Sequence, residues 1–121
     1  IQNNPHAFQL HLMRGTILRA LGREADSLPA FERGAEEAIA ARPPLGDENE
    51  NAEKLGWDRY KEQDARTVAR MAILIGKKVA DREHVLRLAR KYAAVFTEDL
   101  ILERQIRILT GQEQDPTDEQ K

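Results

Sequence analysis

Residues 21–34 read LGREADSLPAFERG, and this stretch decides the fold. Gly22 directly follows the last apolar residue of an upstream helical pattern, where a left-handed helix C-cap is expected. Asp26 or Ser27 can cap the next helix. Pro29 is expected in the first turn of that helix, where its missing amide proton costs nothing. The stretch therefore predicts the turn and the second helix of a short antiparallel helical hairpin.

Apolar residues repeat at helical spacing on both sides of this turn. The upstream stripe predicts a helix over residues 6–21 and consists of Leu10, Met13, Ile17, Leu18 and Leu21. The downstream stripe predicts a helix that ends at Pro43-Pro44 and consists of Leu28, Phe31, Ala35, Ala38 and Ile39. These two helices and the turn between them would form the hairpin.

The second half of the chain repeats the order of helix, tight turn and helix. A third helix is predicted from about residue 58 to residue 78, with a broad apolar face of Ala65, Val68, Ala69, Ala72, Ile73, Ile75 and Gly76. Asp81 is a good N-cap for a fourth helix. Thr97 can cap a fifth helix, with Glu98 and Asp99 favourably placed at its positive end.

The predicted fold class is all-α, with about five helices in antiparallel hairpins. Alternating runs of β-branched and aromatic residues, which would indicate strands, are missing. The hairpins would form either a repeat-like array or a compact helical bundle. A chain of 121 residues allows one domain, and we expect it over residues 1–112, with an acidic linker near 44–56 and a polar tail over 113–121.

Composition excludes several classes of site. The chain has no cysteine, so disulfides, thiolate zinc sites and cysteine nucleophiles are excluded. No run of eighteen apolar residues is visible, so we expect no membrane span. The lack of cysteine fits a reducing compartment, and we expect a cytoplasmic location.

The first hairpin resembles a tetratricopeptide-type repeat over about residues 8–43. Gly15 matches the small residue of the first helix, and Gly22 matches the glycine that opens the turn. Phe31 matches the aromatic residue of the second helix, and Gly34 matches the small residue three positions later. The chain departs from the family pattern at His11, Arg14, Ser27, Pro29 and Pro43.

The resemblance implies a scaffold that binds proteins and performs no chemistry. In the family, the first helix of each hairpin lines the binding face, which here corresponds to residues 6–21 and about 58–78. The expected polar contacts to a protein or peptide partner are His11, Arg14, Arg66 and Arg70. The expected function is thus a non-catalytic adaptor or regulatory module.

Candidate chemistry is sparse, so we expect no enzyme, no cofactor and no metal. His6 and His11 are five residues apart and do not share a helical face. Asp81 and His84 form a single i, i+3 pair, and we interpret them as a helix cap and a surface residue. Ser27 is the only serine and has no nucleophile-elbow context.

Nucleic-acid binding is the main alternative. The net charge of −2 is unevenly spread: residues 44–64 carry −4, whereas residues 65–112, with ten basic and five acidic groups, carry +5. Arginine forks suit phosphates. The contacts predicted for this alternative are Lys77, Lys78, Arg82, Arg87, Arg90 and Lys91. The opposing interpretation is that these cations are solvated or pair with the acidic linker.

Self-association is a third possibility. The predicted fifth helix, near 98–110, is apolar on more than one side. Ile101, Ile106 and Ile108 are not expected to face one small core together. A homodimer through this helix would bury the apolar residues that the core leaves exposed.

Overall fold

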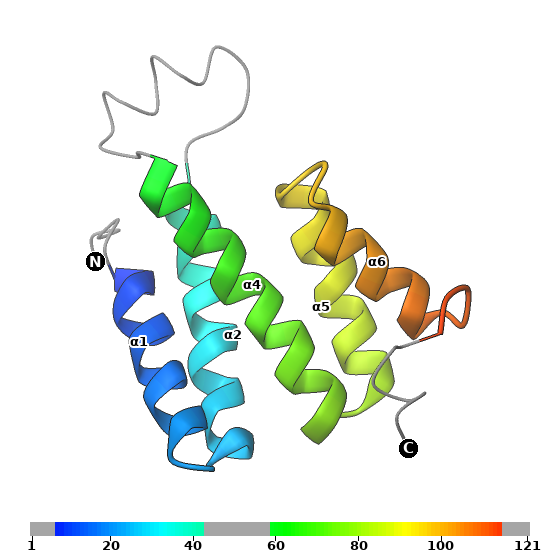
Figure 1. The fold of residues 1–121 in the computed structure, drawn as a ribbon. Coiled ribbons are helices and arrows are strands. Elements are labelled where there is room, and N and C mark those ends of the chain that lie inside the picture. The colour runs from blue at the N-terminus through cyan, green and yellow to red at the C-terminus, as the bar shows by residue number, and fades with distance from the viewer. Residues whose placement is uncertain (1–6, 43–58, 115–121) are drawn as a thin grey trace.

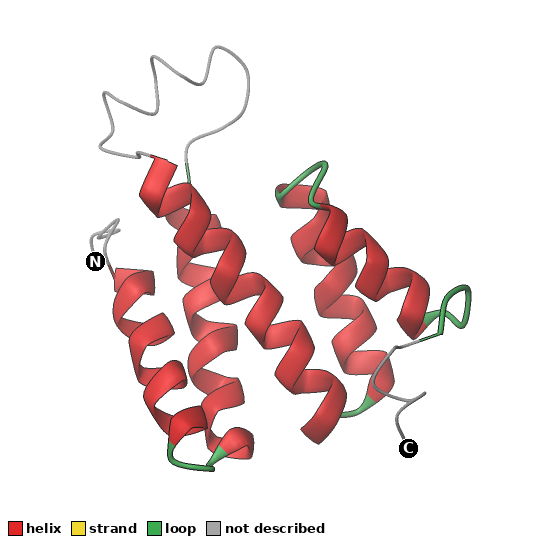
Figure 2. Ribbon diagram, viewed as in Figure 1, coloured by secondary structure: helices red, strands yellow, loops and turns green. Residues whose placement is uncertain are grey.

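The computed structural model of the chain describes residues 7–42 and 59–114. These residues form five helices and no strand (Figures 1 and 2). The helices are α1 (Ala7–Ala20), α2 (Glu24–Ala41), α4 (Arg59–Val79), α5 (Arg82–Val95) and α6 (Leu100–Leu109). The predicted all-α class is therefore confirmed. The predicted linker near 44–56 and most of the predicted tail lie outside the described residues.

The turn between α1 and α2 has the geometry expected from Gly22. Its φ is +78°, in the left-handed region that glycine adopts at little cost. The Gly22 amide donates to the Arg19 carbonyl at 3.0 Å, and the Arg23 amide donates to the Leu18 carbonyl at 2.9 Å. These two bonds form a Schellman motif, so the predicted C-cap is confirmed.

Helix α2 starts earlier than predicted. It begins at Glu24, directly after the Schellman turn, and no side chain caps it. Pro29 is consequently the sixth residue of the helix and does not lie in its first turn. A proline there leaves the Ala25 carbonyl without its usual helical donor. Ala25 and Pro29 are both exposed, so water can hydrate that carbonyl and the helix tolerates the proline.

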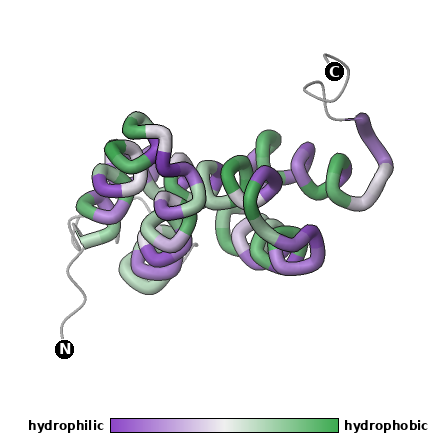
Figure 3. Tube along the Cα trace, turned by 90° about the horizontal axis from the view of Figure 1, so that it is seen from below, coloured by the Kyte–Doolittle hydropathy of each residue, from purple (hydrophilic) through white to green (hydrophobic). Residues whose placement is uncertain are grey.

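The helices follow one another as an array whose ends are α1 and α6. Helix α1 packs on α2, α2 packs on α4, and α5 packs on α6. Figure 1 shows α4 in front of α2, α6 in front of α5, and α1 and α6 at opposite ends. In the view from below, hydrophobic and hydrophilic stretches alternate along the helices (Figure 3). This arrangement is compatible with an array of helical hairpins.

The core is formed largely by the predicted faces of α2 and α4. The buried residues of α4 include the whole predicted apolar face, namely Ala65, Val68, Ala69, Ala72, Ile73, Ile75 and Gly76. The largest fully buried side chains in the described residues are Tyr92, Phe8, Phe31 and Phe96. Many of these α4 residues are small, which lets a neighbouring helix approach closely: a Cβ added at Gly76 would lie 3.0 Å from a methyl carbon of Val85 on α5.

Helix α6 is capped by a different residue from the one predicted. Asp99 is its N-cap, and the Asp99 carboxylate accepts a hydrogen bond from the Leu102 amide at 3.0 Å. Thr97, the predicted cap, is exposed two residues upstream. Glu98 between them has a φ of 63°, in the left-handed region. Asp81 does occupy the N-cap position of α5, but its side chain makes no capping hydrogen bond.

Candidate functional site

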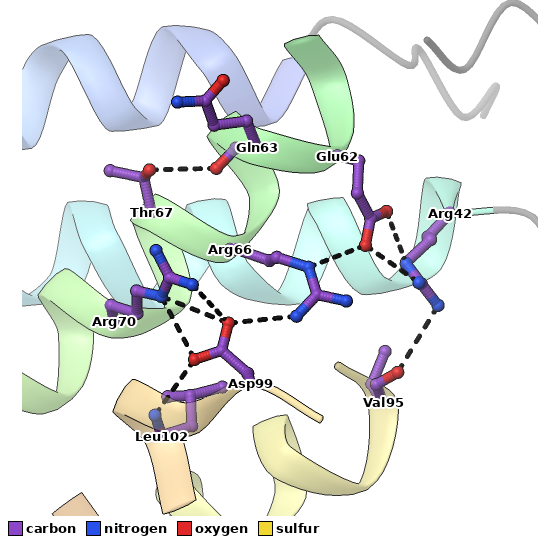
Figure 4. Close-up of polar contacts among 9 residues, drawn as sticks. All are labelled: Arg42, Glu62, Gln63, Arg66, Thr67, Arg70, Val95, Asp99 and Leu102. Atoms are coloured by element: carbon purple, nitrogen blue, oxygen red, sulfur yellow. Dashed lines mark hydrogen bonds and ion pairs between the residues drawn. The ribbon is translucent and has the colours of Figure 1, made fainter. Parts of the chain in front are cut away.

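Two of the predicted partner contacts, Arg66 and Arg70, bind the same buried carboxylate. They lie one turn apart on α4 and both reach Asp99 at the start of α6 (Figure 4). Arg70 Nη2 donates to Asp99 Oδ2 at 2.7 Å, and Arg66 Nη1 donates to the same oxygen at 3.1 Å. The Asp99 side chain is fully buried. Asp99 therefore joins α6 to α4.

The ionised form of Asp99 is favoured in the fold. Burial opposes ionisation, but hydrogen bonds from Arg70, the Leu102 amide and Arg66 outweigh it and hold the pKa of Asp99 below its ordinary value. A buried carboxylate with three donors is a structural arrangement rather than a reactive one. It offers no group whose pKa lies near neutrality, as a general acid or base would require.

A second carboxylate extends this network toward the end of α2. Glu62 accepts hydrogen bonds from Arg42 at 2.8 Å and from Arg66 at 3.0 Å. The Arg42 and Arg66 guanidinium groups both lie over the Phe96 ring, 5.3 and 5.5 Å from its centre. Arg42, Glu62, Arg66, Arg70 and Asp99, hereafter the Asp99 network, connect α2, α4 and α6.

The network limits what Arg66 and Arg70 can offer a partner. Their side chains are 24% and 29% exposed, so about three quarters of each is inaccessible to a partner. The sequence predicted both arginines on one face of the third helix and Asp99 at the start of the fifth, but not the contact between them. Two arginines at i and i+4 lie on one helix face and could bind an anion together. The sequence does not show that this anion is the carboxylate of Asp99, about thirty positions away.

The other two predicted contacts, both on α1, point in different directions. His11 faces α2, and its Nε2 lies 2.7 Å from Glu37 Oε2. Arg14 is exposed. Among residues 7–42 and 59–114, no carboxylate pairs with it. Arg14 is therefore the predicted contact that is most open to a partner.

Arg14 lies beside a feature that sequence reasoning found but did not assign to a binding surface. Four large apolar side chains of the α1 end of the molecule are exposed by 64%, 60%, 53% and 67%, namely Leu10, Met13, Ile17 and Leu21, hereafter the α1 stripe. Helix α1 is buried instead through Phe8 and Gly15. Leu10 and Ile17 follow these two residues by two positions, which places them about 200° around the helix axis. The stripe thus points away from α2.

The basic residues predicted for nucleic acid do not form one uninterrupted surface. Lys78 pairs with Glu24 at 3.2 Å, and Arg87 lies 3.3 Å from the His84 ring. Arg87, Arg90 and Lys91 share the exposed outer side of α5. That side also carries Glu83.

Helix α6 exposes fewer apolar side chains than its sequence predicts. Ile108 is buried, and Ile106 packs against the core. Leu100 and Ile101 remain exposed, by 76% and 44%. The homodimer through this helix stays a prediction.

The described residues hold few groups arranged for chemistry. No three histidine or carboxylate side chains gather there in a way that would hold a metal ion. His84 pairs with Glu32 at 3.1 Å. Burial, and next the charges of Glu32 and Glu36, raise the pKa of the Tyr92 hydroxyl above its ordinary value, so it stays protonated at neutral pH. No helix within the described ranges is long and apolar enough to cross a membrane.

Comparison with known proteins gave no match: no protein-family model, no curated protein and no solved structure matches the chain. The functional argument therefore rests on the geometry of these surfaces.

Proposed function

We propose that this chain is a non-catalytic helical module that binds a protein segment, in an adaptor or regulatory role. The observation that carries the proposal is the α1 stripe, in which four large apolar side chains are each more than half exposed. Single exposed apolar residues are ordinary on protein surfaces, but a contiguous patch of this kind is typical of an interaction site. The resemblance of the first hairpin to a protein-binding repeat supports the same function.

The proposal moves the centre of binding from the arginines of α4 to helix α1. Arg66 and Arg70 both bind Asp99, and about three quarters of each side chain is buried. The α1 stripe, by contrast, offers a hydrophobic centre, and Arg14 offers a charged group at its rim. A hydrophobic centre with a polar rim is the common anatomy of a protein interface.

The test is affinity capture from lysate of the source, with nuclease and at moderate salt, using three forms of the tagged full chain. These are the wild type, Leu10→Ser and the matched control Leu100→Ser, whose target residue is at least as exposed. We expect a defined set of proteins to be retained by the wild type and the control and lost from Leu10→Ser. Equal retention by all three forms would contradict the proposal.

Both variants should fold as the wild type does. Leu10 and Leu100 are 64% and 76% exposed, so each substitution should change the free energy of unfolding by less than about 0.5 kcal/mol. Urea denaturation checks this before the capture is interpreted. A large loss of stability in Leu10→Ser would assign the stripe to the fold and not to binding.

Nucleic-acid binding remains the second candidate, on one observation. Arg87, Arg90 and Lys91 lie together on the outer side of α5, where their charges are accessible to phosphates. Such binding would weaken steeply with salt, because each phosphate contact releases counterions. Nucleic acid recovered at low salt and lost from Arg90→Glu would move the assignment to α5.

A further inference from the structure

The α1 stripe has a shape and a charge that restrict what can cover it. Helix α1 carries two basic residues, Arg14 and Arg19, and no acidic one. Arg14 follows Leu10 by one turn and precedes Ile17 by one turn, so it lies on the same side of the helix as the stripe. The surface is therefore an apolar line with a positive charge near its middle.

The packing of the other helices shows how such a stripe is covered within this molecule. The second helix of the first hairpin, α2, packs on the helix that follows it, α4. The second helix of the second hairpin, α5, packs in the same way on the helix that follows it, α6. At the first of these contacts, Gly34 of α2 lies against Val68 of α4. Helix α1 has no equivalent neighbour on its stripe side among the described residues. A helix laid along the stripe would continue the same order.

The area of the stripe fits one helix. From the exposed fractions, its four side chains present on the order of 400 Å², about half of the ~800 Å² that each partner buries in a standard protein interface. A helix that docks on an apolar surface is anchored by residues at i, i+3, i+4 and i+7, and such a single line of anchors suits the single line of the α1 stripe.

A second copy of the chain is a poor occupant. A two-fold dimer pairs the same patch with itself, so Arg14 would meet the Arg14 of the other copy, and α1 has no carboxylate to offset them. Like charges brought together at an interface cost free energy, which disfavours a second copy on this surface. A partner with a carboxylate opposite Arg14 would replace this repulsion with an attraction.

We infer that the α1 stripe binds an acidic amphipathic helix, whose apolar residues cover Leu10, Met13, Ile17 and Leu21 and whose carboxylate pairs with Arg14. This inference rests on the proposed protein-binding function and adds the chemistry of the partner to it. The helix lies along α1 on the side opposite to α2.

The two methionines of the chain allow a local test. Met13 lies in the stripe and is 60% exposed, whereas Met71 is partly buried against the core. The full chain, labelled with ¹³C at the methionine methyl groups, is titrated with a helix-stapled peptide that carries a leucine stripe and glutamates. A second peptide has the same leucines and lysines in place of the glutamates. We expect the acidic peptide to shift the Met13 signal and leave the Met71 signal unchanged.

Charge reversal gives the second measurement. Arg14→Glu should weaken the acidic peptide by about tenfold and strengthen the lysine peptide, because it inverts the charge at the rim. The matched control Arg104→Glu, an exposed arginine on α6 at the opposite end of the array (Figure 1), should change both affinities by less than about twofold, because distant exposed charges are screened. Equal binding of both peptides, or an Arg14→Glu variant that behaves as the control does, would overturn the inference.

The remaining outcomes separate this inference from the proposed function. A Met13 signal that shifts with protein concentration in the absence of peptide would assign the stripe to a second copy and overturn the inference. If neither peptide binds while Leu10→Ser still loses its captured proteins, the protein-binding function stands and the acidic helix is wrong. If Leu10→Ser loses nothing and neither peptide binds, both fail.

Discussion

At the scale of single residues, Asp99 combines two roles, as a helix cap and as the partner of two arginines. It caps α6 through the Leu102 amide and binds both Arg66 and Arg70 of α4. A buried carboxylate is costly unless donors surround it, and here three donors do so. The position of α6 on α4 therefore depends on one charged group, and substitutions at Asp99 should show how much.

Asp99→Ala is expected to lower the free energy of unfolding by about 2–3 kcal/mol. The variant loses the helix cap and leaves Arg70 without a carboxylate partner, whereas Arg66 keeps its ion pair with Glu62. Arg66 and Arg70 are about a quarter exposed, so water can solvate them in part, which keeps the loss below that of a fully buried pair. Urea denaturation measures it, with Glu103→Ala, an exposed carboxylate of the same helix, as the control. A loss no larger than the control's would contradict the role of the Asp99 network.

The same carboxylate predicts a dependence of stability on pH. Because the pKa of Asp99 is lower in the fold than in the unfolded chain, ionised Asp99 stabilises the fold fully above the unfolded-state value of about 4. That stabilisation is lost as the pH falls from there through the folded-state pKa. In Asp99→Asn the contribution is absent at every pH, so the difference in urea midpoint between wild type and variant should shrink from pH 7 toward pH 3. A constant difference would show that Asp99 does not titrate as described.

At the scale of helices, the sequence predicts the buried face of α4 but not that of α1. The glycine C-cap after α1 and the apolar face of α4 could be read directly, because each depends on a local conformation or on a single period. Helix α1 has two apolar sides, one with Phe8 and Gly15 and one with the α1 stripe. Periodicity detects the stripe, but burial depends on which side the neighbouring helix takes. Gly15 was the available signal, since close packing of two helices requires a small residue at the contact.

Gly15→Ala tests that explanation. A Cβ at Gly15 would lie 2.6 Å from a carbon of the Phe31 ring, and Phe31 is fully buried and cannot move aside cheaply. The clash costs more than alanine gains over glycine in helix propensity, so the free energy of unfolding should fall by about 1–2 kcal/mol. Thr16→Ala, at the exposed neighbouring position, is the control for urea denaturation. A more stable Gly15→Ala variant would mean that α1 does not pack on α2 through this face.

At the scale of the whole molecule, α1 and α6 close the array but differ in how they are held. Helix α6 is attached to α4 by Asp99 and to α5 by its apolar face. Helix α1 is attached to α2 and α4 through one buried side that includes Phe8 and Gly15. An array of this kind is stabilised by contacts between neighbours, so its ends need not unfold together. The candidate site could be predicted only in part for the same reason: Arg14 and the stripe are local to α1, whereas the partner of Arg66 and Arg70 is set by the tertiary arrangement.

Hydrogen exchange should reveal this difference between the ends. Local opening exposes amides according to how much apolar contact holds each helix, so α1 should exchange faster than α4, which contacts all four other described helices. Mass spectrometry of the native chain at neutral pH would measure this, with Asp99→Ala for comparison. In that variant, exchange should accelerate in α6 and stay unchanged in α1, because the Asp99 network does not include α1.

The acidic helical peptide should slow exchange in α1 alone, since it covers the side of that helix that nothing else described contacts. Uniform exchange across α1 and α4, or acceleration in every helix of Asp99→Ala, would instead describe a single cooperative unit whose ends cannot respond to a partner separately.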